Sequence, residues 1–222
     1  MEITKSKEGV KIRLPPYKIN IKKTKGVEKI NHQYSKSYEF EKDFEFYSNK
    51  YLKAPVKYFS FLRPLNELQI AMLFSKHEKY HSTFKSCNVG SKSKEWKWCC
   101  DCPKCLFVYT ILSHFLYKDK LIHIFGTDMF ENKNLLNTFI ELTGYGETKP
   151  FECVGTKEEI NLSLDIMVDK YKTMNVELPK LLEGYTYDKA ALKSKINKMI
   201  ANWNNKNNLP YKFEEKLKKY II

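Results

Sequence analysis

Five of the six cysteines of this 222-residue chain fall within nineteen residues, at positions 87–105. Cys99, Cys102 and Cys105 repeat at a spacing of three, and Cys87 precedes the first of them by twelve residues. Two residues between cysteines let the chain fold back and aim both sulfurs at one point, and four thiolates make the tetrahedral site that Zn²⁺ prefers. The spacing therefore predicts a structural zinc site formed by Cys87, Cys99, Cys102 and Cys105, with Cys100 directed away from the metal.

A disulfide cluster or a group of buried free thiols is the alternative for the same cysteines. Disulfides are typical of exported proteins, and the segment Met1–Arg13 is too charged to be a signal peptide. No apolar run approaches the roughly 20 residues that a membrane-spanning helix needs. These features favour a cytoplasmic protein without a membrane partner, in which the cysteines stay reduced.

The formal net charge of +13 makes polyanions natural partners, either nucleic acid or small molecules that carry phosphate. Lys is spread along the chain, whereas Arg occurs only at Arg13 and Arg63. Evenly distributed Lys is also typical of a solubilising surface. The charge by itself is therefore weak evidence for a nucleic-acid partner.

The elements that must position these residues can be read from apolar periodicity. Aromatic residues recur near helical spacing in 38–52, which predicts a helix capped by Ser37. The apolar run Tyr58–Leu62 predicts a strand, and a turn and a helix follow it. Because ligands in open α/β sheets lie beyond the carboxyl ends of strands, Arg63 and Glu67 occupy a suggestive position. For Glu67 alone, an ordinary acid of a first helical turn is the simpler interpretation.

Pro103 opens a predicted helix that is apolar on nearly all sides up to Phe115 and must therefore be buried. Further helices are predicted at 132–143, 157–174, 189–203 and 212–220. We expect three regions: a basic, β-leaning extension at 1–25, a main domain at 26–175 with the cysteine segment inside it, and a helical tail at 176–222.

Four strings resemble one known family. They are NHQYSKSYEFE at 31–41, FLRPLNEL at 61–68, WCCDCPKCLFV at 98–108 and KPFECVGT at 149–156. Together they are similar, in the same order, to the carboxyl-terminal half of the bacterial UDP-N-acetylmuramoyl-L-alanyl-L-glutamate epimerases, and the resemblance covers about 26–159. Those enzymes are taken to be ATP pyrophosphatases of the PP-loop type. Their cysteine segment also resembles the zinc site of the 7-cyano-7-deazaguanine synthases.

The resemblance implies inversion of the terminal L-glutamate of a nucleotide-linked muramoyl dipeptide to D-glutamate, a step of peptidoglycan precursor synthesis, with ATP and Mg²⁺ as cosubstrate and metal. For the fold it implies a helix-rich α/β protein: a truncated open sheet of the PP-loop type, a four-cysteine zinc knuckle and a helical carboxyl-terminal region.

Six residues of the family strings are candidates for the active site. His32 (the first candidate acid or base), Glu67 and Glu152 are candidates for catalysis, and Lys36, Arg63 and Lys149 for binding phosphate or carboxylate groups of the substrate. We expect them to converge on one polar pocket. A core or capping role for His32, and capping or surface ion pairs for the others, are the alternatives.

One departure from the family matters. A PP-loop enzyme cradles pyrophosphate in a Ser-Gly-Gly-x-Asp-Ser type of loop, and the eight glycines of this chain are scattered. The chain therefore lacks the expected ATP-binding half and should be inactive alone; that half is a separate amino-terminal subunit, or the chain is a fragment, or the module has been reused. The rival hypothesis is a basic zinc module that binds nucleic acid through Lys, Trp96 and Trp98.

Overall fold

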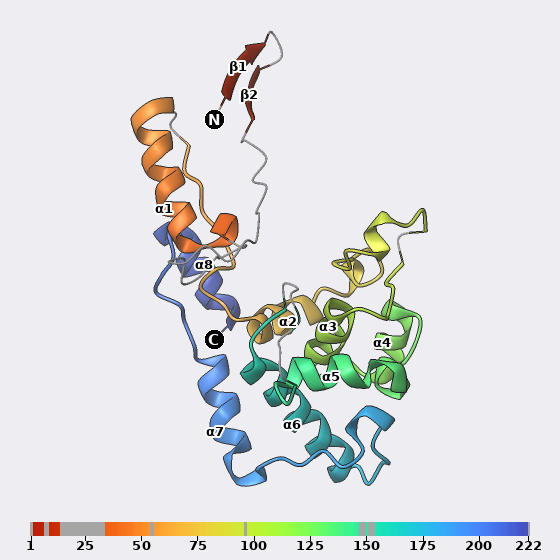
Figure 1. Ribbon diagram of the computed structural model, residues 1–222. Coiled ribbons are helices and arrows are strands. Elements are labelled where there is room, and N and C mark those ends of the chain that lie inside the picture. Colours follow the sequence, from red (N-terminus) through yellow and green to blue (C-terminus); the bar gives the residue numbers. More distant parts are fainter. Residues whose placement is uncertain are drawn as a thin grey trace, which may run out of the picture.

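The computed structural model describes residues 2–6, 9–13, 34–53, 56–95, 97–146, 150 and 154–221, and these residues are mostly helical (Figure 1). The helices are α1 (Tyr38–Tyr47), α2 (Glu67–Ser75), α3 (Pro103–Ser113), α4 (Lys118–Phe125), α5 (Leu136–Thr143), α6 (Lys157–Thr173), α7 (Lys189–Ile200) and α8 (Tyr211–Ile221). A π-helical turn, Ser48–Leu52, continues α1. None of these helices combines the length and apolarity needed to cross a bilayer.

One sheet occurs in the described part of the chain. Strands β1 (Glu2–Ser6) and β2 (Gly9–Arg13) pair antiparallel, with Glu2 opposite Arg13 and Ser6 opposite Gly9. This hairpin fits the β-leaning character of the first segment, and the open sheet of the PP-loop type stays a prediction.

Helix α3 is the centre of the larger core, as the apolar run after Pro103 predicts. Eight of its eleven residues are buried, and Leu106 is completely inaccessible to solvent. It packs against α2, α4, α5 and α6, which surround it in Figure 1. Pro103 occupies the first turn, where its missing N–H leaves no hydrogen bond unmade.

Side-chain caps define where the neighbouring helices begin. Ser37 accepts a hydrogen bond from the backbone N–H of Phe40 and caps α1, as predicted. Helices α2 and α6 both start with a capping box, in which the cap side chain and the third helical residue satisfy each other's backbone N–H. The two pairs are Asn66 with Gln69 and Thr156 with Glu159.

The predicted strand at Tyr58–Leu62 is wrong, because residues 56–60 are irregular and 61–64 form a turn. Its aromatic side chains pack on helices instead of forming one face of a sheet. Tyr58 lies edge-on against Phe44 of α1, with ring centroids 5.1 Å apart, and Phe59 packs on Phe213 of α8 at 5.4 Å. No neighbouring strand is present among the described residues, so packing of the rings decides the conformation.

A second, smaller core joins the end of the chain to this turn. Leu65, Leu209 and Leu217 are buried together, and Trp203 packs against them. The backbone N–H of Asn204 donates to the carbonyl of Pro64 at 2.8 Å, so the polar connection before α8 runs back over the start of α2. The helical tail is thereby attached to the body.

Gln69 is the main polar link between α2 and the end of α7. Its side chain is 1% exposed, its carbonyl accepts from the N–H of Asn66, and its amide donates to the carbonyls of Ile200 (2.7 Å) and Asn202 (2.8 Å). The Gln69 side chain is buried, so its loss would leave partly buried partners unpaired, which is costly.

We predict that Gln69→Met lowers the free energy of unfolding by roughly 2–4 kcal/mol, because it leaves one donor and two acceptors unpaired. Ser75→Ala is the control, since that hydroxyl bonds only to the Met72 carbonyl of its own helix, and it should change stability by less than about 0.5 kcal/mol. Urea denaturation of both variants measures the difference. Equal stability of the two variants would contradict the assigned role of Gln69.

Candidate metal centre and adjoining helix N-termini

The four cysteines predicted to bind a metal lie together. The sulfurs of Cys87, Cys99, Cys102 and Cys105 are all within 4.8 Å of one another. Individual separations are 3.4 Å for Cys102–Cys105, 3.6 Å for Cys99–Cys105 and 3.9 Å for Cys87–Cys102. Metal–sulfur bonds of about 2.3 Å in a tetrahedron place sulfurs about 3.8 Å apart, so the cluster has the dimensions of a four-thiolate site.

The start of α3 supplies two of the sulfurs and a sharp turn supplies a third. Cys102 is the residue before the helix and Cys105 lies in its first turn. Cys100 has a φ of 54°, in the left-handed region, which separates the directions of the adjacent side chains. The Cys100 thiol donates to the carbonyl of Phe125 at 3.1 Å, so it is engaged with α4 rather than with the cluster.

Gly90 allows the loop that carries Cys87 to approach the cysteine turn. Its N–H donates to the Cys87 sulfur at 3.1 Å. A β-carbon built on Gly90 would lie 1.7 Å from the carbonyl oxygen of Lys97, which is a backbone atom and cannot rotate away. Only glycine therefore permits this loop geometry.

The thiols are arranged to carry negative charge. The hydrogen bond that Cys102 shares with Cys105 lowers the pKa of Cys102 to about 5 and raises the pKa of Cys105. Burial raises the pKa of Cys99 to about 11. One thiolate is thus stabilised by protons shared with its neighbours, and a divalent cation would replace those protons.

A second polar feature lies where α2 and α6 begin. Glu159, which is 4% exposed, accepts the N–H of Glu67 at 2.7 Å through one oxygen and the N–H of Thr156 at 2.7 Å through the other. One carboxylate therefore bridges the positive ends of two helices. Gly155 is needed beside it, because a β-carbon there would lie 2.7 Å from Glu159 and 2.8 Å from the Phe107 ring.

Glu67 is accessible to solvent but crowded by its surroundings. Loss of hydration and then the nearby Glu159 carboxylate raise the pKa of Glu67, while the Lys104 ammonium opposes the shift. The Glu67 carboxyl group, with a second carboxylate and a lysine beside it, can exchange a proton with a ligand.

Arg63 and Lys36 lie together in the structure, but the Arg63 side chain contacts the backbone carbonyl of Lys36. The Arg63 guanidinium pairs with Glu41 at 3.0 Å and donates to the carbonyls of Lys36 (2.9 Å) and Ser37 (3.3 Å). Glu41 is 1% exposed and also accepts the N–H of Ser60. Arg63 thus joins α1 to the turn before α2, and contact with a substrate stays a prediction for it and for Lys36.

Three predicted site residues, His32, Lys149 and Glu152, lie outside the described residues, as do Cys153 and Trp96. The convergence of all six candidates on one pocket therefore stays a prediction.

Analysis of the sequence overlooked Glu159, although the Thr156-x-x-Glu159 pattern of a capping box could have indicated it. It also overlooked Lys104 and Gly90, for which no short pattern gives a signal.

The fold and these sites define a helical domain with a four-cysteine centre of metal-binding type. The family model of the MurL C-terminal domain matches residues 83–194, and that of the MurL N-terminal domain matches residues 20–61. The chain therefore belongs to the MurL family.

Two curated relatives carry the name UDP-N-acetyl-alpha-D-muramoyl-L-alanyl-L-glutamate epimerase. The protein of Xanthomonas oryzae pv. oryzae is 34% identical over 149 residues, which cover 65% of this chain and 33% of the relative. The protein of a Micromonospora species is 37% identical over 143 residues, covering 64% and 32% respectively. The aligned residues thus span about a third of the length of these relatives. No solved structure matches the chain.

We predict that Gly90→Ala opens the cysteine cluster, because the new methyl group collides with the Lys97 carbonyl. Stability should fall by roughly 2–4 kcal/mol, as for other substitutions that force backbone strain in a core. The buried thiols of Cys87, Cys102 and Cys105 should also react faster with a disulfide reagent.

Gly184→Ala is the matched control. Gly184 has a φ of 75° and open space around it, so an added methyl group costs only local strain, about 1 kcal/mol. Thiol reactivity should then equal that of the wild type. Wild-type thiol reactivity in Gly90→Ala would contradict the role assigned to Gly90.

Proposed function

We propose that this chain contributes the carboxyl-terminal domain, together with a short part of the amino-terminal domain, of an ATP-dependent epimerase that converts the L-glutamate of UDP-N-acetylmuramoyl-L-alanyl-L-glutamate to D-glutamate. The observation that carries the proposal is the match of the MurL C-terminal family model to half of the chain. The names of the relatives supply the substrate. Cys102, Asn66 and Thr156, which belong to three of the four strings, directly precede α3, α2 and α6.

The chemistry explains why ATP would be needed. A free carboxylate opposes removal of the adjacent α-proton, since its negative charge destabilises the carbanion. Transfer of AMP from ATP to that carboxylate, with release of pyrophosphate, gives an acyl-adenylate that is neutral at the carbonyl and whose enolate is far more stable. Removal of the α-proton on one face and its return on the other invert the centre, and water then releases AMP and restores the carboxylate.

Glu67 is the described residue best suited to move that proton. Glu67 is exposed as a residue, and loss of hydration around its carboxyl group raises the pKa, which increases its basicity. The buried Glu159 holds the N-terminus of α2 in place beneath it. His32 and Glu152 remain the other candidates for acid–base catalysis, and Lys36, Arg63 and Lys149 those for binding the phosphates and carboxylates.

The four-cysteine centre would hold one structural Zn²⁺. Four thiolates fill a tetrahedral site and leave no position for water or substrate, so the metal would stabilise the fold rather than take part in the reaction. It would fasten the loop of Cys87 to the start of α3, close to Lys104 and Glu67. Cys100 and Cys153 would not be needed.

We predict one Zn²⁺ per purified chain. Cys102→Ser should lose most of the metal and destabilise the fold, whereas Cys100→Ser should retain it, because the Cys100 thiol bonds to Phe125. Mass-spectrometric metal analysis with parallel thermal denaturation measures both effects. Unchanged zinc in Cys102→Ser, or loss of zinc in Cys153→Ser, would reject this ligand set.

The ATP- and Mg²⁺-binding part is proposed to be supplied by the amino-terminal region of the family. No glycine-rich loop of the PP type occurs in these 222 residues, so they lack the backbone amides that would cradle pyrophosphate. Lys side chains can attract ATP weakly, and ATP binding alone is therefore not diagnostic.

We predict that the chain alone does not convert ATP to AMP. Addition of the amino-terminal region of the Xanthomonas relative should restore formation of AMP and of the D-glutamyl product from the L-alanyl-L-glutamyl muramoyl nucleotide. A muramoyl nucleotide that ends at L-alanine is the substrate control. High-performance liquid chromatography of nucleotides and chiral analysis of the released glutamate measure the two products.

In the restored system Glu67→Gln should reduce the rate at least roughly 100-fold, in line with loss of a general acid or base. Glu158→Gln removes an exposed carboxyl group from the first turn of α6 and should leave the rate unchanged. AMP formation by the isolated chain would contradict the proposal. Tight, salt-sensitive binding of RNA or DNA without a response to the muramoyl nucleotide would favour the basic zinc module.

A further inference from the structure

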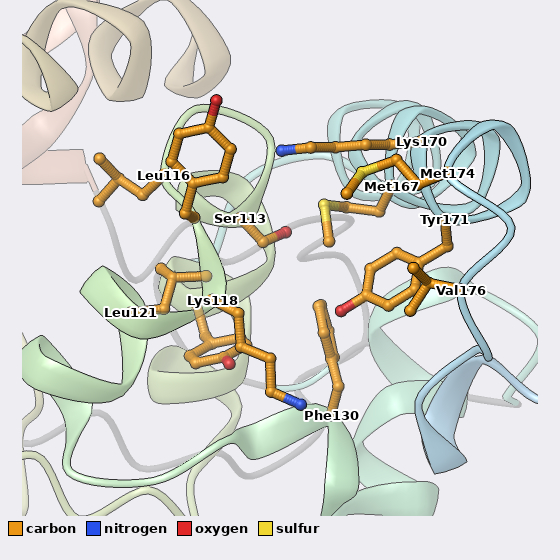
Figure 2. A pocket seen from close by; sticks show the side chains of 12 residues that line it. Ser113, Leu116, Lys118, Leu121, Phe130, Met167, Lys170, Tyr171, Met174 and Val176 are labelled. Atoms are coloured by element: carbon orange, nitrogen blue, oxygen red, sulfur yellow. The ribbon is translucent and has the colours of Figure 1, made fainter.

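A cavity of about 200 Å³ lies between the end of α3, the start of α4 and the last turns of α6 (Figure 2). Ser113 marks the end of α3 that borders it, while the cysteine centre adjoins the opposite end of the same helix. Cys105 of that centre and Ser113 are eight residues apart along the helix, a rise of roughly 12 Å. The cavity is therefore distinct from the metal centre and from the N-termini of α2 and α6.

Aromatic rings and methionines form most of its wall. Phe130 and Tyr171 enclose it from one side, and the two methionine side chains Met167 and Met174 extend over it from α6 (Figure 2). Methionine sulfur packs favourably against aromatic rings and adapts to their shape. These walls suit a flat aromatic group better than a branched aliphatic one.

The charged groups around the cavity are two lysines, together with the carboxylates of Asp128 and Glu131, which lie near Tyr171. Lys118 is paired with Asp128 at 2.8 Å, which neutralises it. Lys170 makes no ion pair within the described residues, and its ammonium lies 4.7 Å from the centre of the Tyr117 ring. The hydroxyl of Tyr171 points toward the interior and forms no hydrogen bond with another residue in the described part of the chain (Figure 2). Burial raises the pKa of Tyr171, so the hydroxyl keeps its proton at neutral pH and can donate.

Apolar side chains are also unusually exposed around the opening. Tyr117 is 70% exposed, Met174 60% and Val176 49%, and all three line the cavity. An apolar rim beside an unpaired cation is typical of a ligand site rather than of an ordinary surface.

We propose that this cavity binds a small aromatic carboxylate, with the ring between Phe130, Met167 and Tyr171 and the carboxylate on the Lys170 ammonium. A cavity of 150 Å³ accommodates benzene, so the present volume fits one ring with a short side arm. The charge and the donors select an anion over a neutral or cationic head group. The proposal is independent of the epimerase reaction.

The test uses the full chain with ¹³C-labelled methionine methyl groups and 3-phenylpropionate as the probe. Of the six methionines, Met167 and Met174 line the cavity, whereas Met72 and Met199 do not. We expect saturable shifts of the first two signals and none of the last two. The isosteric alcohol, 3-phenylpropan-1-ol, should bind at least tenfold more weakly.

Two lysine variants on one helix separate local from general charge effects. Lys170→Met should raise the dissociation constant for 3-phenylpropionate by about five- to tenfold and leave that of the alcohol unchanged. Lys172→Met is the matched control, since Lys172 contacts the Tyr187 ring away from the cavity, and it should have no effect.

Val176→Trp fills the opening and should abolish both the shifts and the binding. Shifts that do not saturate, equal affinity for the alcohol, or equal weakening by Lys170→Met and Lys172→Met would each overturn the proposal. Retention of probe binding in Val176→Trp would also place the ligand elsewhere.

Discussion

Burial of α3 on all sides is the constraint on which the other sites depend. A helix that is apolar around its whole circumference has to be enclosed, and α2, α4, α5 and α6 enclose it. Enclosure fixes the position of both ends of the helix. The first turn then presents Cys102 and Cys105 to the cysteine turn, and the last residue, Ser113, borders the apolar cavity.

The polar groups near α3 are organised by bonds to helix ends rather than by surface ion pairs. Glu159 satisfies backbone N–H groups at the start of both α2 and α6, and Gln69 satisfies carbonyls after α7. The Glu159 and Gln69 side chains that make these bonds are buried, so the bonds help to fix the relative positions of the elements they join. The side chain of Glu67 projects from this framework, which explains how an exposed carboxyl group has a defined neighbour.

At the cysteine centre, side chains also hold separate segments together, here a loop and the start of α3. Cys87 comes from a loop without regular structure, and its approach to α3 depends on Gly90 and on the four sulfurs themselves. A bound cation would replace the protons shared by the thiols and would link the Cys87 loop to the start of α3. Such a constraint matters most for a loop, because it offers little apolar surface to bury.

The sequence by itself determined the local features whose signals lie within a few residues. Cysteine spacing identified the four clustered sulfurs, Ser37 identified the start of α1, and apolar periodicity identified the buried helix after Pro103. The residue strings also led to the MurL family, and the family models match. Each of these signals is short because caps, turns and helix faces are set by neighbours along the chain.

Only the tertiary structure decided which distant residues meet. The apolar run Tyr58–Leu62 reads as a strand, yet its rings pack on α1 and α8, since a strand needs a partner that no local pattern can guarantee. The bridge from Glu159 to Glu67 spans 92 positions, and the cavity beside Lys170 draws its wall from three helices. Contacts of this kind arise when the elements pack, so they cannot be predicted from the spacing of residues along the chain.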